Sequence, residues 1–210
     1  MKYIASLILL LACSSLHSDF IRKSGGEEVV LNDSKRETTT SKTSFDGDFR
    51  SAMWEDSKEV VKSHEVWVLE EEGENYLAYS GWLLGYKAVA IYSFATDKLI
   101  RGNYHLIKEH TNKNLYIDDY FEIQSELKAK YGRCKEDIIW KNDLYRDDRS
   151  EYGFAVSLGH LVYQSSWHDY SSDILLLLTG DNYEIELIIQ YKSHNHDKLK
   201  RSRRKQMNDL

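Results

Sequence analysis

The clearest hydrophobic pattern of the chain lies between residues 116 and 131 and predicts a helix. Acidic residues stand in its first turn, at Asp118 and Asp119, two lysines stand in its last turn, and Gly132 follows as a C-terminal cap. Its apolar side chains recur at helical spacing, at Ile117, Tyr120, Phe121, Ile123, Leu127 and Tyr131.

A shorter helix is expected to begin near Asp56. Asp56 stands three residues before Glu59, which is the spacing of a capping box. Val60, Val61 and His64 then follow at helical spacing.

Segments rich in Tyr, Ile, Val and Leu follow each predicted helix and indicate antiparallel strands. They are separated by Gly, Asn and Asp, which favour turns. The expected strands are 76–80, 85–94 and 98–109 after the first helix, and 138–142, 152–158, 160–167, 173–179 and 183–191 after the second. The fold class is therefore α+β, with two helix-plus-antiparallel-meander units. A tandem duplication that forms a curved sheet would produce this order, although the side chains show no internal repeat.

The N-terminus has the features of an export signal. One positive charge, at Lys2, precedes an uncharged run from Ile4 to Ala12, which is too short to span a bilayer. The sequence Leu10-Leu11-Ala12-Cys13 resembles the bacterial lipoprotein signal. This resemblance implies that residues 1–12 are removed, that Cys13 is acylated with fatty acids such as palmitate, and that Ser14 after it favours the outer membrane, facing the periplasm.

Two alternatives to lipidation stay open. A plain cleaved signal would give a secreted or periplasmic protein, and an uncleaved signal would act as a membrane anchor. Cys13 and Cys134 are the two cysteines, so lipid on Cys13 excludes an intrachain disulfide, whereas a Cys13–Cys134 disulfide would require a free Cys13. In the lipidated form we expect Cys134 to be a small buried side chain.

The polarity of the chain suggests four parts. The signal peptide (1–12) is followed by a polar tether (13–50), an α+β domain (51–193, with units of about 51–112 and 113–193) and a basic polar tail (194–210). The basic residues of the tail could bind anionic lipid head groups or an acidic partner, or they could serve only to keep the chain soluble. They are Lys198, Lys200, Arg201, Arg203, Arg204 and Lys205.

The opening Trp54-Glu55-Asp56-Ser57 and the repeated helix-and-meander order resemble the tandem units of the β-lactamase-inhibitor-protein fold. They are also similar to the small lipoprotein of the outer-membrane β-barrel assembly machinery, and more widely the chain resembles an uncharacterised family of bacterial lipoproteins. The resemblance implies a binding module without catalytic residues.

Composition and charge narrow the function classes. The chain has 210 residues with 15 Tyr and 5 Trp, enough large side chains for one ordinary domain or two small ones. Proline is absent, which excludes collagen-like and polyproline architectures. The net charge of −6 argues against a nucleic-acid partner.

The sequence carries none of the common short motifs of nucleotide, zinc-protease, redox or serine-hydrolase sites. The metal candidate is His194-Asn195-His196-Asp197, for which a solvated polar terminus is the favoured interpretation, so no metal or other cofactor is expected. The remaining histidines outside the polar segments show no ligand spacing and are interpreted as surface or strand-face residues: His64, His105, His110, His160 and His168.

Three carboxylate clusters are interpreted as structural. Residues 70–74 are expected to form a solvated turn, and Asp118 and Asp119 to favour a helix N-terminus. The third cluster, Asp143 with Asp147 and Asp148, lacks the ligand pattern of a calcium loop.

Aromatic strand residues suggest a candidate recognition surface, because aromatic side chains dominate binding hot spots. Its members are Tyr86, Tyr92, Tyr104, Tyr163 and Trp167. Core or cross-strand packing is the competing interpretation.

The leading functional hypothesis is a lipid-anchored cell-envelope protein that acts as a non-catalytic binding or structural module for an envelope protein partner. A periplasmic or surface hydrolase that uses scattered histidines and carboxylates is one alternative. The other is an inhibitor of a secreted enzyme, which would insert the acidic segment 70–74 into its target.

Overall fold

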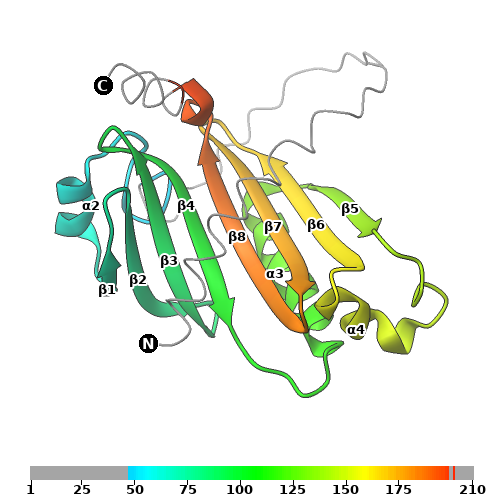
Figure 1. The fold of residues 1–210 in the computed structure, drawn as a ribbon. Helices are drawn as coiled ribbons and strands as arrows, with labels where there is room; N and C mark the ends of the chain where they lie inside the picture. Colours follow the sequence, from blue (N-terminus) through cyan, green and yellow to red (C-terminus); the bar gives the residue numbers. More distant parts are fainter. Residues whose placement is uncertain (1–46, 199–200, 202–210) are drawn as a thin grey trace, which may run out of the picture. The chain divides into compact units, whose positions relative to one another are not determined.

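The computed structural model describes residues 47–198 and 201, and these form one antiparallel sheet with helices (Figure 1). The signal segment, Cys13 and most of the tether lie outside the described residues. Within the described part, no helix is long and apolar enough to cross a membrane. In chain order the elements are α2 (Lys58–His64), β1 (Val68–Glu72), β2 (Tyr76–Leu83), β3 (Tyr86–Ala95), β4 (Lys98–Ile107), α3 (Leu115–Tyr131), β5 (Lys135–Trp140), the 3-10 helix η2 (Arg149–Glu151), α4 (Tyr152–Ser157), β6 (Leu161–His168), β7 (Ser172–Asp181) and β8 (Glu184–Ser193).

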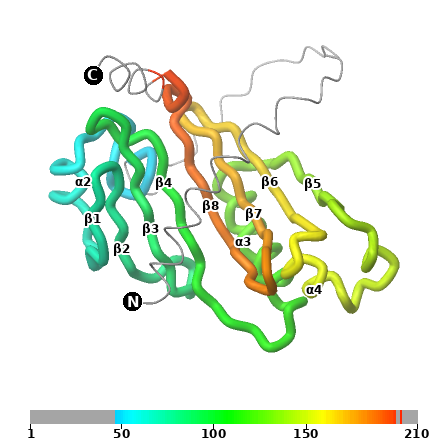
Figure 2. The backbone as a smooth tube through the Cα atoms, in the orientation of Figure 1, coloured from blue at the N-terminus to red at the C-terminus, as the bar shows by residue number. Residues whose placement is uncertain are grey.

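The eight strands lie in the order β1-β2-β3-β4-β8-β7-β6-β5. Two four-stranded meanders, β1–β4 and β5–β8, therefore join where β4 pairs antiparallel with β8, with Tyr104 opposite Ile189. Figure 2 shows β4 and β8 side by side in the middle of the sheet. The predicted α+β class is confirmed, and a helix precedes each meander.

The helix predicted over 116–131 is confirmed as α3. Tyr120, Ile123 and Leu127 are buried on its inner side, and the helix packs against β6, β7 and β8. Gly132 ends it with φ at 81°, a backbone conformation that glycine adopts without strain. Phe121, expected on the buried side, is 43% exposed, because one residue beyond Tyr120 lies about 100° further around the helix.

The first helix begins one residue later than a cap at Asp56 would place it. Ser57 is the N-cap, and its side chain accepts a hydrogen bond from the backbone N–H of Val60. Asp56 instead accepts from the N–H of Met53, closing the turn before the helix.

Two predicted segments have the wrong secondary structure. Residues 68–72 form strand β1, although a solvated turn was expected over residues 70–74. Because β1 is an edge strand with mostly exposed side chains, its sequence has no alternation of hydrophobic and polar residues that would predict a strand. Residues 152–157 form helix α4 rather than a strand, since a short apolar run is compatible with either. Gly153 lets this helix approach the start of α3 closely, because a Cβ there would lie 2.3 Å from the backbone of Lys113.

Both predicted domain boundaries need correction. Phe49, placed in the tether, is 1% exposed, and its ring packs against Tyr92, Tyr104 and Tyr191. At the other end β8 runs to Ser193, and His196, placed in the polar tail, is buried. Buried residues therefore lie on both sides of 51–193, while most of the basic run 198–205 lies outside the described residues.

Candidate functional site

The five aromatic residues of the predicted recognition surface lie in the core. Each is at most 7% exposed: Tyr86, Tyr92, Tyr104, Tyr163 and Trp167. Their shared neighbours are the apolar side chains of the sheet face that α3 covers. This placement corrects the expectation of an exposed aromatic surface. The five residues are part of the core, as the competing interpretation expected.

Exposed apolar side chains gather instead at the free edge of the sheet. Val66, Val68 and Trp82 are 86%, 66% and 71% exposed. Val68 pairs with Ser80 in the β1–β2 ladder, so Val68 and Trp82, two residues beyond Ser80, lie on the same face of the sheet, and Val66 precedes β1 by two residues. We call these three residues the edge patch. Beside it β1 is the terminal strand of the sheet, so its outer backbone edge has no neighbouring strand among the residues described.

The edge is acidic as well as apolar. Glu70 and Glu71 accept hydrogen bonds from the hydroxyls of Ser80 and Tyr76, and within the described structure no cation lies at ion-pair distance from either. Glu72, by contrast, is paired with two lysines of α2. The outer end of β1 thus carries negative charge that the described residues do not neutralise.

A buried carboxylate connects this edge to the core. Glu65 accepts hydrogen bonds from Arg50 Nε at 2.8 Å and Nη2 at 2.9 Å, from the Tyr92 hydroxyl, and from the backbone N–H groups of Val66 and Trp67. Burial alone would raise the pKa of Glu65, but these hydrogen bonds outweigh it and lower the pKa below its usual value. The Arg50 guanidinium also lies 3.8 Å from the centre of the Trp67 ring.

Asp119 is buried, although the sequence suggested only a favourable place in the first turn of a helix. Its oxygens accept hydrogen bonds from the Tyr86 hydroxyl at 3.0 Å and Lys108 Nζ at 2.7 Å, and Oδ2 lies 2.5 Å from His110 Nε2. Burial opposes ionisation, but these contacts lower the pKa of Asp119. Because both oxygens are engaged within the fold, the cluster ties α3 to β3 and the β4–α3 connection.

Cys134 does not have the features of an activated nucleophile. It is a free, partly exposed thiol rather than the small buried side chain expected. It contributes to an open hollow of about 440 Å³ beside Lys128 and Glu136. Burial of the thiol raises its pKa, whereas reactive cysteines have a lowered one.

Two members of the third carboxylate cluster make local contacts on the surface. Asp148 caps η2 by accepting from the backbone N–H of Ser150, and Asp143 pairs with Arg146.

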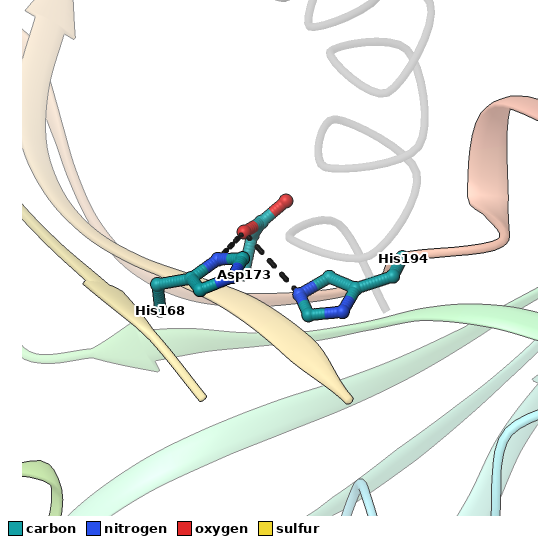
Figure 3. A group of neighbouring side chains, drawn as sticks. All are labelled: His168, Asp173 and His194. Atoms are coloured by element: carbon teal, nitrogen blue, oxygen red, sulfur yellow. Dashed lines mark hydrogen bonds and ion pairs between the residues drawn. The ribbon is translucent and has the colours of Figure 1, made fainter. Parts of the chain in front are cut away.

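Two histidines and an aspartate converge at one end of the second meander (Figure 3). His168 ends β6, Asp173 lies at the start of β7, and His194 follows β8. His168 Nδ1 lies 2.6 Å from Asp173 Oδ1, and His194 Nε2 lies 3.6 Å from the same oxygen. The imidazole rings are stacked with centroids 4.6 Å apart. Two imidazoles and a carboxylate are donors that can hold Zn²⁺.

The sequence did not reveal this group, because its members come from three segments that only the strand register brings together. The metal candidate expected from His194-Asn195-His196-Asp197 is not assembled. His196 is 4% exposed, accepts from Arg101 Nη2 at 3.1 Å and lies 2.9 Å from Asp197. Burial lowers the pKa of His196 to about 4, in keeping with a neutral ring beside a guanidinium.

Comparison of the chain with protein-family models, with curated proteins and with solved structures gives no match. Its function is therefore inferred from its own residues.

Proposed function

We propose that this chain is a lipid-anchored cell-envelope protein that acts as a non-catalytic binding module, and that it binds an extended segment of an envelope protein along strand β1. The observation that carries the proposal is the edge patch beside a terminal strand. Exposed apolar residues that cluster in this way are typical of interaction sites.

The chemistry of the edge defines the partner segment. An extended segment that adds to a terminal strand gains main-chain hydrogen bonds, and its side chains contact the neighbouring residues. Val66, Val68 and Trp82 favour apolar side chains in that segment. Glu70 and Glu71 favour Lys or Arg beside them, since their charges are not neutralised within the described residues.

The other titratable groups support a non-catalytic role. Both oxygens of Asp119 are occupied by contacts within the fold, and the pKa of the Cys134 thiol is raised. We also propose that the two halves arose by tandem duplication, which the helix followed by four antiparallel strands in each half supports, although α4 and η2 occur in the second half alone among the residues described. An inhibitor of a secreted enzyme would use the same acidic edge, so the identity of the bound protein distinguishes the two functions.

Replacement of Cys13 by serine is expected to release the protein from membranes, because two or more acyl chains hold a protein firmly while the remaining contacts do not. Fractionation of the native cells after an alkaline wash measures this, and incorporation of labelled fatty acid reports acylation directly. Cys134→Ser is the matched control and should stay in the membrane fraction. Retention and labelling of the Cys13→Ser variant would contradict the lipid anchor.

Replacement of Trp82 by lysine is expected to weaken partner binding by about 30-fold or more, since loss of an aromatic hot spot costs at least about 2 kcal/mol. A photo-crosslinking amino acid at Val66 in the full-length, membrane-bound protein should capture one discrete partner, and the affinity of the captured segment is then measured on purified protein.

The matched control for this prediction is Ile138→Lys. Ile138 is 58% exposed on β5, the opposite terminal strand, so its replacement should leave crosslinking and affinity unchanged. Equal loss in both variants, or an adduct that Trp82→Lys does not weaken, would exclude β1 as the binding edge.

A further inference from the structure

We propose that His168, Asp173 and His194 form a zinc-binding site at the end of the β6–β7–β8 meander. The site is remote in topology from β1, at the other half of the sheet, and the inference does not depend on the proposed partner. Figure 3 shows both imidazole rings directed at the same carboxylate.

The backbone around the site is held by the sheet. His168 and Asp173 are directly opposite each other in the β6–β7 ladder, and a backbone hydrogen bond of 2.9 Å from Asp169 to Ser172 closes the turn between them. The N–H of His194 donates to the carbonyl of Ser171 at 3.2 Å. The three ligands therefore start from fixed backbone positions, as a metal site requires.

The distances suit a small tetrahedral ion. The three donor atoms lie within 4.8 Å of one another. Zinc with bonds of 2.0–2.1 Å holds its ligand atoms about 3.3 Å apart. The observed 2.6 Å and 3.6 Å separations lie on either side of that value, and rotation about the side-chain torsions, which would also turn the two stacked rings out of their parallel arrangement, would complete the coordination.

The donor set favours zinc over the hard cations. Imidazole nitrogen suits Zn²⁺, whereas Mg²⁺ and Ca²⁺ take oxygen ligands. In the described structure no Lys or Arg forms an ion pair with Asp173; its two ion-pair partners are the histidines themselves. Because the three side chains are solvent-accessible, water would occupy the fourth position, and we expect an affinity in the micromolar range.

Calorimetric titration of the full-length, detergent-extracted protein with zinc chloride tests the site. We expect one ion per chain, no competition from a large excess of magnesium chloride, and weaker binding as the pH is lowered, because metal binding releases protons from its ligands. His168→Ala, Asp173→Asn and His194→Ala should each lower the affinity at least tenfold. Substitution by Co²⁺ adds a spectroscopic readout, because the intensity of its visible bands reports tetrahedral coordination.

His64→Ala is the matched control, since His64 is an exposed histidine on α2, outside the site. It should bind zinc as the unmodified protein does. Thermal melts without zinc check that the three ligand variants remain folded. No binding by the unmodified protein, or the same affinity in all three ligand variants, would overturn the proposal.

Discussion

Replacing Glu65 with alanine is expected to destabilise the protein by about 3–5 kcal/mol, the cost of breaking a buried ion pair from one side. The Glu65 side chain is 1% exposed and the Arg50 side chain 11%, so the variant leaves a guanidinium charge with little access to water. It also removes the acceptor of the Tyr92 hydroxyl and of two backbone N–H groups that lead into β1. Each of these losses lowers the stability of the folded protein further.

Urea denaturation followed by Trp fluorescence measures this change. Glu59→Ala is the matched control, on the helix that ends just before Glu65. Glu59 is 83% exposed at its side chain and pairs with Lys62 on the surface, so its loss should cost at most about 0.5 kcal/mol. The double variant Arg50→Ala/Glu65→Ala should cost less than the two single variants added together, since it removes both charges. Equal stability of Glu65→Ala and Glu59→Ala would show that the pair does not support the core.

Acid is expected to destabilise the protein through His105, by roughly 3 kcal/mol between pH 7 and pH 4. His105 on β4 is 7% exposed, it lies between Val89 and Ile188 of the neighbouring strands, and neither ring nitrogen has a hydrogen-bond partner among the described residues. Burial lowers its pKa to about 4 from an ordinary value of 6.5.

The lowered pKa determines the direction of the pH effect. Between pH 6.5 and pH 4 the unfolded chain binds a proton at His105 that the folded chain does not, so stability falls as the pH falls through this range and is unaffected by this group above it. His196, with a pKa also near 4, acts in the same direction. Burial raises the pKa of Glu186, which acts in the opposite direction. The pH profile of the unmodified protein therefore sums several groups.

Comparison with His105→Leu isolates the contribution of His105. At pH 7 the free energy of unfolding of the variant should lie within about 1.5 kcal/mol of that of the unmodified protein, because leucine has no polar atom to leave unpaired. Its advantage should grow by roughly 3 kcal/mol as the pH falls to 4. The exposed control His64→Leu should follow the profile of the unmodified protein. Parallel profiles for His105→Leu and the unmodified protein would show that His105 is not buried in its neutral form.

Helix α3 is an element of this chain that the local sequence pattern predicts correctly. Its apolar spacing and Gly132 predicted the helix to within one residue at its start, because both signals lie within a few residues of the backbone they shape. The α+β class and seven of the eight strands followed from similar local signals. Segment 152–158 was assigned wrongly, because a short apolar run has no period that separates a strand from a buried helix.

The sites depended on contacts between distant residues. Tyr92 and Trp82 are both aromatic strand residues, yet one is fully buried and the other is 71% exposed, because Tyr92 lies on a central strand facing the core and Trp82 near the free edge. Strand β1 has no hydrophobic alternation, and only its pairing with β2 identifies it as the edge. No local signal indicated the edge patch.

The sequence by itself determined the helices at 58–64 and 115–131 to within two residues, the α+β class and the expectation of an export signal with Cys13 as the lipid anchor. Only the tertiary structure decided the order of the strands, the burial of Glu65 and His105, and the meeting of His168, Asp173 and His194. The physical reason is that helix formation and capping depend on residues three or four positions apart. Burial and ligand geometry depend instead on the register between strands, which is set by the packing of the whole sheet.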